Sequence, residues 1–243
     1  MPSPTHRLAF AAVALALMCR VAAADELADF NAAIEDVAAH NRTAIGYLQT
    51  DAIEMAVAEM ELAKNAWGAF AERFGGRRPQ VFADNQRYTE ALVDVPLRIV
   101  TGFLMLNLGR RDLAVNSLQA IREELSAIRR QSGVTVLADC VLDANKATAA
   151  LAARETNPPD LNDANVAGEV AVEADALGTT LKRCSAMAPA DVRDDPAFRR
   201  LIDGPLAALD TIPSAINSKD AALLHKTIDE LRAFDALLTW RYG

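Results

Sequence analysis

Apolar residues recur at alternating spacings of three and four along most of the chain, and this period predicts amphipathic α-helices. The clearest run extends from Ile53 to Phe74 and stops at the pair Gly75-Gly76, where a helix is expected to end. No segment shows the sustained two-residue alternation that is typical of a β-strand. The pattern predicts about eight helical segments, which include residues 26–49, 53–74, 82–108, 118–128, 137–151, 170–184, 197–218 and 219–242.

Short turns separate these segments, so we predict an all-α fold, an antiparallel helical bundle built from about four helical hairpins. Prolines inside two of the segments predict interruptions. Pro96 indicates a kink or a break near Asp94, and Gly204-Pro205 and Pro213 indicate breaks in the helical region that contains them.

The strongest interruption of the pattern is a Pro-rich connection over residues 156–163, and a second loop rich in Asp and Pro covers residues 187–196. We expect the Pro-rich connection to divide the chain into a helical N-terminal half, residues 25–155, and a helical C-terminal half, residues 164–243. The two halves are expected to pack against each other, as one domain or as two.

Three of the predicted turns have similar sequences, over residues 47–54, 106–112 and 215–220. Their separations are close to multiples of a single period, which favours an internal repeat of helical hairpins. The alternative is convergence, because any pair of antiparallel helices needs such a turn.

The first 24 residues have the three parts of a secretory signal peptide. A short start contains Arg7, the apolar run Leu8–Cys19 follows, and Ala22–Ala24 provide small residues for cleavage before Asp25. The apolar run is too short to span a bilayer, which needs about 20 residues. The alternative is an N-terminal anchor that is retained. We expect a periplasmic or secreted protein with no transmembrane segment after cleavage.

Composition agrees with a folded, helix-rich chain, because 51% of the residues are hydrophobic and only 5% are aromatic. The 33 acidic residues outnumber the 25 basic ones, which gives a net charge of −8. An acidic chain is repelled by phosphates, so we expect no nucleic-acid partner.

Cleavage before Asp25 removes Cys19 and leaves Cys140 and Cys184. An even number of cysteines in an exported chain predicts one disulfide, here between the fifth and sixth helical segments. The alternative is two separate buried thiols. The sequence contains no CxxC, no haem-attachment CxxCH and no Cys/His zinc spacing.

Known catalytic and nucleotide-binding signatures are absent, so a non-enzymatic role is favoured. The mature chain would have only two histidines, and each lies four residues from an aspartate: Asp36 with His40, and His225 with Asp229. Residues four apart share a helix face. If the first and last helices pack antiparallel, the two pairs come together and could bind a divalent metal. The alternative is two local ion pairs in water.

Two features of the predicted core have open interpretations. Trp67, Phe70 and Phe74 have core spacing, which favours packing over a cofactor site. Asn41 occupies an apolar-stripe position, where an amide fixes helix register or lines a ligand pocket.

The exported, Ala-rich, acidic bundle resembles periplasmic helical-bundle proteins of the cytochrome c-prime type in architecture and helix lengths. The haem motif of that family is missing, since residues 140–144 read Cys-Val-Leu-Asp-Ala, and the resemblance therefore implies no covalent haem. We predict an exported, non-enzymatic helical protein that binds a protein partner or a small ligand in the periplasm. The alternative is a metal- or haem-handling bundle that uses His40 and His225.

Overall fold

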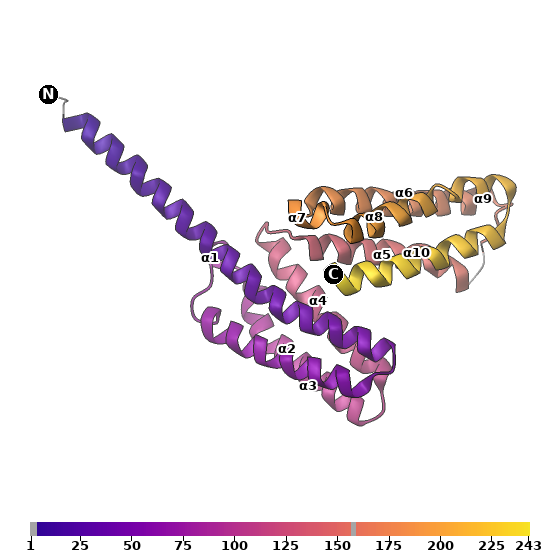
Figure 1. Cartoon of the computed structure of the whole chain (residues 1–243), viewed down its shortest axis with the longest axis horizontal. Coiled ribbons are helices and arrows are strands. Elements are labelled where there is room, and N and C mark those ends of the chain that lie inside the picture. The colour runs from indigo at the N-terminus through magenta and orange to yellow at the C-terminus, as the bar shows by residue number, and fades with distance from the viewer. Residues whose placement is uncertain (1–3, 157–158) are drawn as a thin grey trace. The chain divides into compact units, whose positions relative to one another are not determined.

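The structure is a computed structural model that describes residues 4–156 and 159–243. It is helical throughout, with no β-strand among the described residues, and its helices pair side by side in hairpins (Figure 1). The predicted all-α fold is confirmed. The chain divides into two compact units, Met1–Gly133 and Val134–Gly243.

The N-terminal unit is a four-helix bundle. Its helix α1 packs along α2, α3 packs along α4, and contacts of α2 with α3 and of α1 with α4 complete the bundle. The elements are α1 (Pro4–Gln49), α2 (Ile53–Phe74), the short 3-10 helix η1 (Gln80–Phe82), α3 (Gln86–Asn107) and α4 (Arg111–Gln131).

An aromatic cluster fills one end of this bundle. Phe30 of α1 is 1% exposed, and its ring lies 5.3 Å from Phe70 and 4.6 Å from Phe82, measured between centroids. Trp67 and Phe74 are also buried, with 3% of each residue exposed. These aromatic side chains are therefore part of the hydrophobic core, as their spacing predicts.

The C-terminal unit is built around α10, which packs against α5, α8 and α9, while α6 packs against α5 and α8. Its helices are α5 (Leu137–Thr156), α6 (Ala164–Met187), α7 (Ala190–Arg193), α8 (Pro196–Leu209), α9 (Ile212–Ser218) and α10 (Ala221–Tyr242). A disulfide between Cys140 and Cys184 joins α5 to α6, with 5.4 Å between the two Cα atoms. The predicted disulfide is thus present, and both cysteines are buried.

The division of the chain falls at Gly133 and Val134, which corrects the expected division at residues 156–163. The Pro-rich connection lies inside the C-terminal unit, where it links α5 to α6, and residues 157 and 158 are outside the described residues. Because α5 packs against α6 and α10, it belongs to the second half of the chain rather than to the first.

Two predicted helix breaks do not occur. Helix α3 continues through Pro96, and its neighbours Val95 and Ile99 are fully buried, so packing holds the helix together across the proline. Helix α8 continues through Gly204 and Pro205, and the break comes later, between Leu209 and Ile212.

Two further segments, the start of α1 and the loop at residues 187–196, also differ from expectation. Helix α1 begins at Pro4, far before residue 26, so the expected signal segment forms its first part. The loop at residues 187–196 contains the short helix α7. Among the described residues, no helix has both the length and the apolar character needed to cross a membrane.

The three similar turns have the same backbone conformation. Asp51, Gly109 and Lys219 adopt positive φ angles of 64°, 70° and 58°. In each turn the following N–H donates to a carbonyl five residues back, as in Ala52 to Tyr47 at 2.9 Å. This is the Schellman motif, which ends a helix and satisfies its last carbonyls. The likeness of the three sequences therefore has a local physical cause.

Candidate functional site

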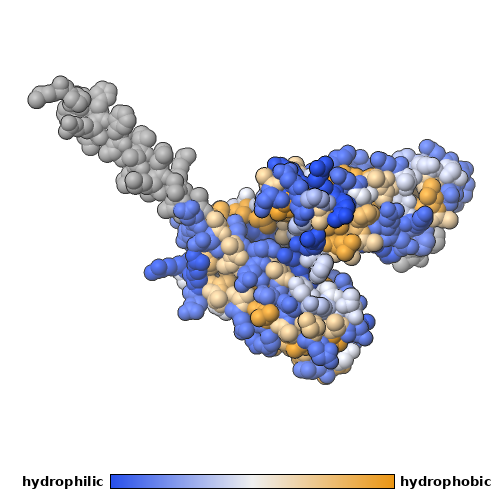
Figure 2. Space-filling model, viewed as in Figure 1, coloured by the Kyte–Doolittle hydropathy of each residue, from blue (hydrophilic) through white to orange (hydrophobic). Residues whose placement is uncertain are grey.

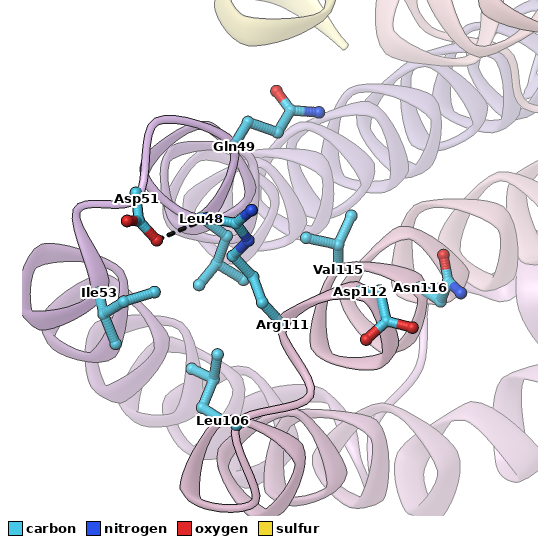
Figure 3. A pocket seen from close by; sticks show the side chains of 10 residues that line it. Leu48, Gln49, Asp51, Ile53, Leu106, Arg111, Asp112, Val115 and Asn116 are labelled. Carbon is cyan, nitrogen blue, oxygen red and sulfur yellow. Dashed lines mark hydrogen bonds and ion pairs between the residues drawn. The ribbon is translucent and has the colours of Figure 1, made fainter.

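Two of these turns meet at one end of the N-terminal unit and enclose an open pocket of about 880 Å³ (Figure 3). One wall is the α1–α2 turn and the other is the α3–α4 turn. The lining residues are Leu48, Gln49, Asp51, Ile53, Leu106, Gly109, Arg111, Asp112, Val115 and Asn116. The pocket therefore draws on all four helices of the bundle.

The floor of the pocket is aliphatic. Leu48 is fully buried, and Ile53, Leu106 and Val115 are partly exposed toward the hollow. Leu48 and Leu106 lie in the last turns of α1 and α3, Ile53 is the first residue of α2 and Val115 is the fifth residue of α4. The Schellman turns bring these helix ends close together. The floor can accept an apolar group of a ligand.

An ion pair crosses the pocket. The Arg111 guanidinium reaches from the start of α4 to the Asp51 carboxylate on the opposite turn, with Nη1 and Oδ1 2.5 Å apart (Figure 3). The two side chains are 49% and 78% exposed. An ion pair that is this exposed contributes about 1 kcal/mol or less to stability. A ligand can therefore replace it at a small cost in free energy.

A second ion pair stands beside the first. Arg110 Nη2 lies 3.5 Å from Asp112 Oδ2. Desolvation acts to raise the pKa of Asp112, but hydrogen bonds from Arg110 and from the Leu113 backbone, together with the Arg110 charge, hold it below the usual value. The pocket lining thus contains the carboxylates of Asp51 and Asp112 and the guanidinium of Arg111, and Arg110 pairs with Asp112 from outside the lining.

His40 has a partner on α2 that the sequence pattern did not predict. Its Nδ1 lies 2.7 Å from Oε2 of Glu59 on α2, while Asp36 Oδ1 is 4.0 Å from Nε2. The sequence contained a signal for this contact, because His40 lies 11 residues before the turn residue Asp51 and Glu59 lies 8 residues after it. The hairpin geometry brings such residues side by side.

His225 forms the predicted pair with Asp229 in the C-terminal unit, at 3.5 Å, and Arg232 lies 3.7 Å from the same carboxylate. His40 and Asp36 belong to the N-terminal unit. Within the residues that the structure describes, no three His, Cys, Asp or Glu side chains gather as a metal site would require. The four-residue metal site stays a prediction.

Asn41 links α1 to α4. Its amide is 1% exposed, and Nδ2 donates to the Leu118 carbonyl oxygen at 3.0 Å. A buried amide loses much of its solvation unless it finds this acceptor, so the bond favours one register of the two helices. This contact supports the register interpretation of Asn41.

Comparison with protein-family models finds none that matches the chain, and no curated protein or solved structure matches it either.

Proposed function

We propose that this chain is an exported, non-enzymatic binding protein, and that its N-terminal unit takes a short peptide or a similar zwitterion in the turn pocket. The observation that carries the proposal is the exposed Asp51–Arg111 ion pair, which stands over an aliphatic floor. The pocket combines one replaceable negative charge, one replaceable positive charge and an apolar surface.

A zwitterion matches this arrangement because it carries both charges that the ion pair would give up. Its carboxylate accepts hydrogen bonds from Arg111, whose planar guanidinium binds carboxylates in a bidentate way. Its ammonium group donates to Asp51. The exchange replaces one ion pair with two, and the ligand also gains the contacts that its apolar side chain makes with Leu106 and Val115.

The size of the pocket fits a ligand of several residues. Its volume of about 880 Å³ lies in the range of small-molecule sites, about 300–1,000 Å³. Gln49 and Asn116 stand at the rim, and their amides can donate to and accept from a peptide backbone.

Export is part of the proposal, and two independent features support it. The N-terminal segment has the composition of a signal peptide. The Cys140–Cys184 disulfide is the type of bond that persists in oxidising compartments such as the periplasm.

The test is calorimetric titration of the protein with the tripeptide Ala-Leu-Ala and with its N-acetylated, C-amidated form. The blocked peptide should bind at least about tenfold more weakly, because it lacks both charges. Arg111→Gln and Asp51→Asn should each weaken binding of the free peptide by a similar factor.

Arg87→Gln is the matched control. Arg87 is also an exposed, ion-paired arginine of the same unit, with Glu124 at 3.8 Å, but it does not line the pocket. Equal binding by the wild type and the Arg111→Gln variant would contradict the proposed site.

A further inference from the structure

Helix α3 carries a second apolar stripe on its exposed side. Apolar patches interrupt the hydrophilic surface seen in Figure 2. Among the described residues, the largest regular set of exposed aliphatic side chains runs along this helix to the residue that caps its end, at spacings of four, three, four and four residues. They are Val93, Leu97, Val100, Leu104 and Leu108, which are 66%, 60%, 55%, 53% and 62% exposed.

The stripe lies opposite the side of α3 that packs into the bundle. The buried side carries Ala91, Val95, Ile99 and Gly102, and at 100° per residue the centre of this set is about half a turn from the exposed stripe. Burial within the bundle therefore does not explain the stripe. Soluble proteins rarely expose an aliphatic face of this length unless another surface covers it.

Charges mark the two ends of the stripe. Glu90 is exposed three residues before Val93, and Arg110 is 56% exposed two residues after Leu108. Between these ends the exposed stripe has no charged member. Arg110 pairs with Asp112 within one copy, so the face is apolar in the middle, with the Glu90 carboxylate at one end and the exposed, ion-paired guanidinium of Arg110 at the other.

We propose that this face binds a second copy of the chain, with the two α3 helices antiparallel about a two-fold axis near Val100. The arrangement pairs Val93 with Leu108 and Leu97 with Leu104 of the other copy. It also places each Glu90 against the Arg110 of the other copy. A parallel pair would place Glu90 against Glu90, so the charges select the antiparallel arrangement.

The spacing of the stripe supports a helix as the occupant. Alternation of three and four residues is the period at which two helices pack along a common seam, with the side chains of one filling the spaces of the other. A two-fold interface needs a surface that is complementary to itself, and the stripe is nearly symmetric about Val100.

Sedimentation equilibrium of the full chain, from micromolar to millimolar concentration, tests the proposal. We expect a monomer–dimer equilibrium. Val100→Glu should weaken it at least about tenfold, because it buries an unpaired charge at the axis. Val172→Glu is the matched control, since Val172 is 69% exposed on α6, outside the stripe, and should leave the equilibrium unchanged.

A charge exchange tests the direction of the helices. Glu90→Arg and Arg110→Glu should each weaken the dimer, and the double variant should recover it. Val100 is exposed in a single copy, so circular dichroism of the Val100→Glu variant should match the wild type. A monomer at every concentration, dimerisation that Val100→Glu leaves intact, or a double variant that does not recover would overturn the proposal.

Discussion

Asp51 and Arg111 stand sixty residues apart in the chain, and their side chains join the two hairpin turns of the N-terminal unit. Asp51 ends α1 in the left-handed conformation, and Arg111 is the first residue of α4 after Gly109 ends α3 in the same way. The shared turn motif places the two charges at the same end of the bundle. The proposed binding site is thus a consequence of how the two hairpins end.

The disulfide should stabilise the C-terminal unit alone. It closes a loop of 44 residues, and Cys140→Ala/Cys184→Ala should lower the free energy of unfolding of that unit by about 2–4 kcal/mol. Urea unfolding in a Trp240→Phe background separates the units, because the remaining tryptophan, Trp67, then reports on the N-terminal unit. A shift of the urea transition that Trp67 reports would contradict this assignment. An unfolding curve by circular dichroism that the double substitution leaves unchanged would contradict it too.

The left-handed turn residues should respond to substitution in opposite directions. Lys219 has a φ of 58°, so Lys219→Gly should stabilise the protein by about 0.5–1 kcal/mol. Gly109 has a φ of 70°, and Gly109→Ala should destabilise it by about 1 kcal/mol. Thermal unfolding provides both values. Lys219→Ala removes the long side chain but keeps a Cβ, and a gain equal to that of glycine would show that the backbone is not the cause.

Gly204 permits the close approach of α8 and α10. A Cβ at this position would lie 2.6 Å from Phe234 Cε1, so Gly204→Ala should destabilise the C-terminal unit by about 1–3 kcal/mol. Gly178 of α6 is the control, because its Cβ would meet Leu209 Cδ1 at an ordinary 3.6 Å. Gly178→Ala should stabilise by about 0.5–1 kcal/mol through helix propensity. Chemical denaturation should give changes of opposite sign, and two changes of the same sign would refute the packing argument.

Tyr88 should make the N-terminal unit less stable at high pH. Burial raises its pKa from 10.0 to about 12, although the charge of Arg78 acts against the shift, and its hydroxyl donates to the Phe74 carbonyl oxygen at 2.8 Å. The unfolded chain releases this proton near pH 10 and the folded chain only near pH 12. The contribution of Tyr88 to the free energy of unfolding is therefore fully present below pH 10. It falls by up to about 2–3 kcal/mol as the pH rises to 12.

Urea unfolding of the wild type and of Tyr88→Phe between pH 9 and 12 measures this loss, and the variant should lose less than the wild type. Tyr47→Phe is the control, because Tyr47 is only partly buried. Parallel pH profiles for the wild type and Tyr88→Phe would show that this hydroxyl is not responsible.

Much of the fold follows from local sequence signals. The period of the apolar residues located α2 from Ile53 to Phe74, and the pair Gly75-Gly76 marked its end correctly. Local signals failed where tertiary packing prevails. Pro96 and Pro205 lie inside continuous helices, since the burial of neighbouring side chains outweighs the lost hydrogen bond.

The site was less predictable than the fold. The likeness of the turns at residues 47–54 and 106–112 was visible, but their meeting depends on the pairing of α1 with α2 and of α3 with α4. Glu59 was missed for the same reason, because its contact with His40 crosses a hairpin. The boundary between the two units, after Gly133, could not be predicted either. A short turn within a unit and a short turn that connects two units have similar composition.

Chemical-shift mapping of the wild-type protein with Ala-Leu-Ala would locate the proposed peptide site residue by residue. Backbone amide signals are recorded for the whole chain as the peptide is added. We expect shifts that saturate and that concentrate at residues 48–53 and 106–116, and the same signals should not move when the peptide is added to Arg111→Gln. Shifts that lie elsewhere, that never saturate, or that persist in Arg111→Gln would contradict a ligand site built on the Asp51–Arg111 pair.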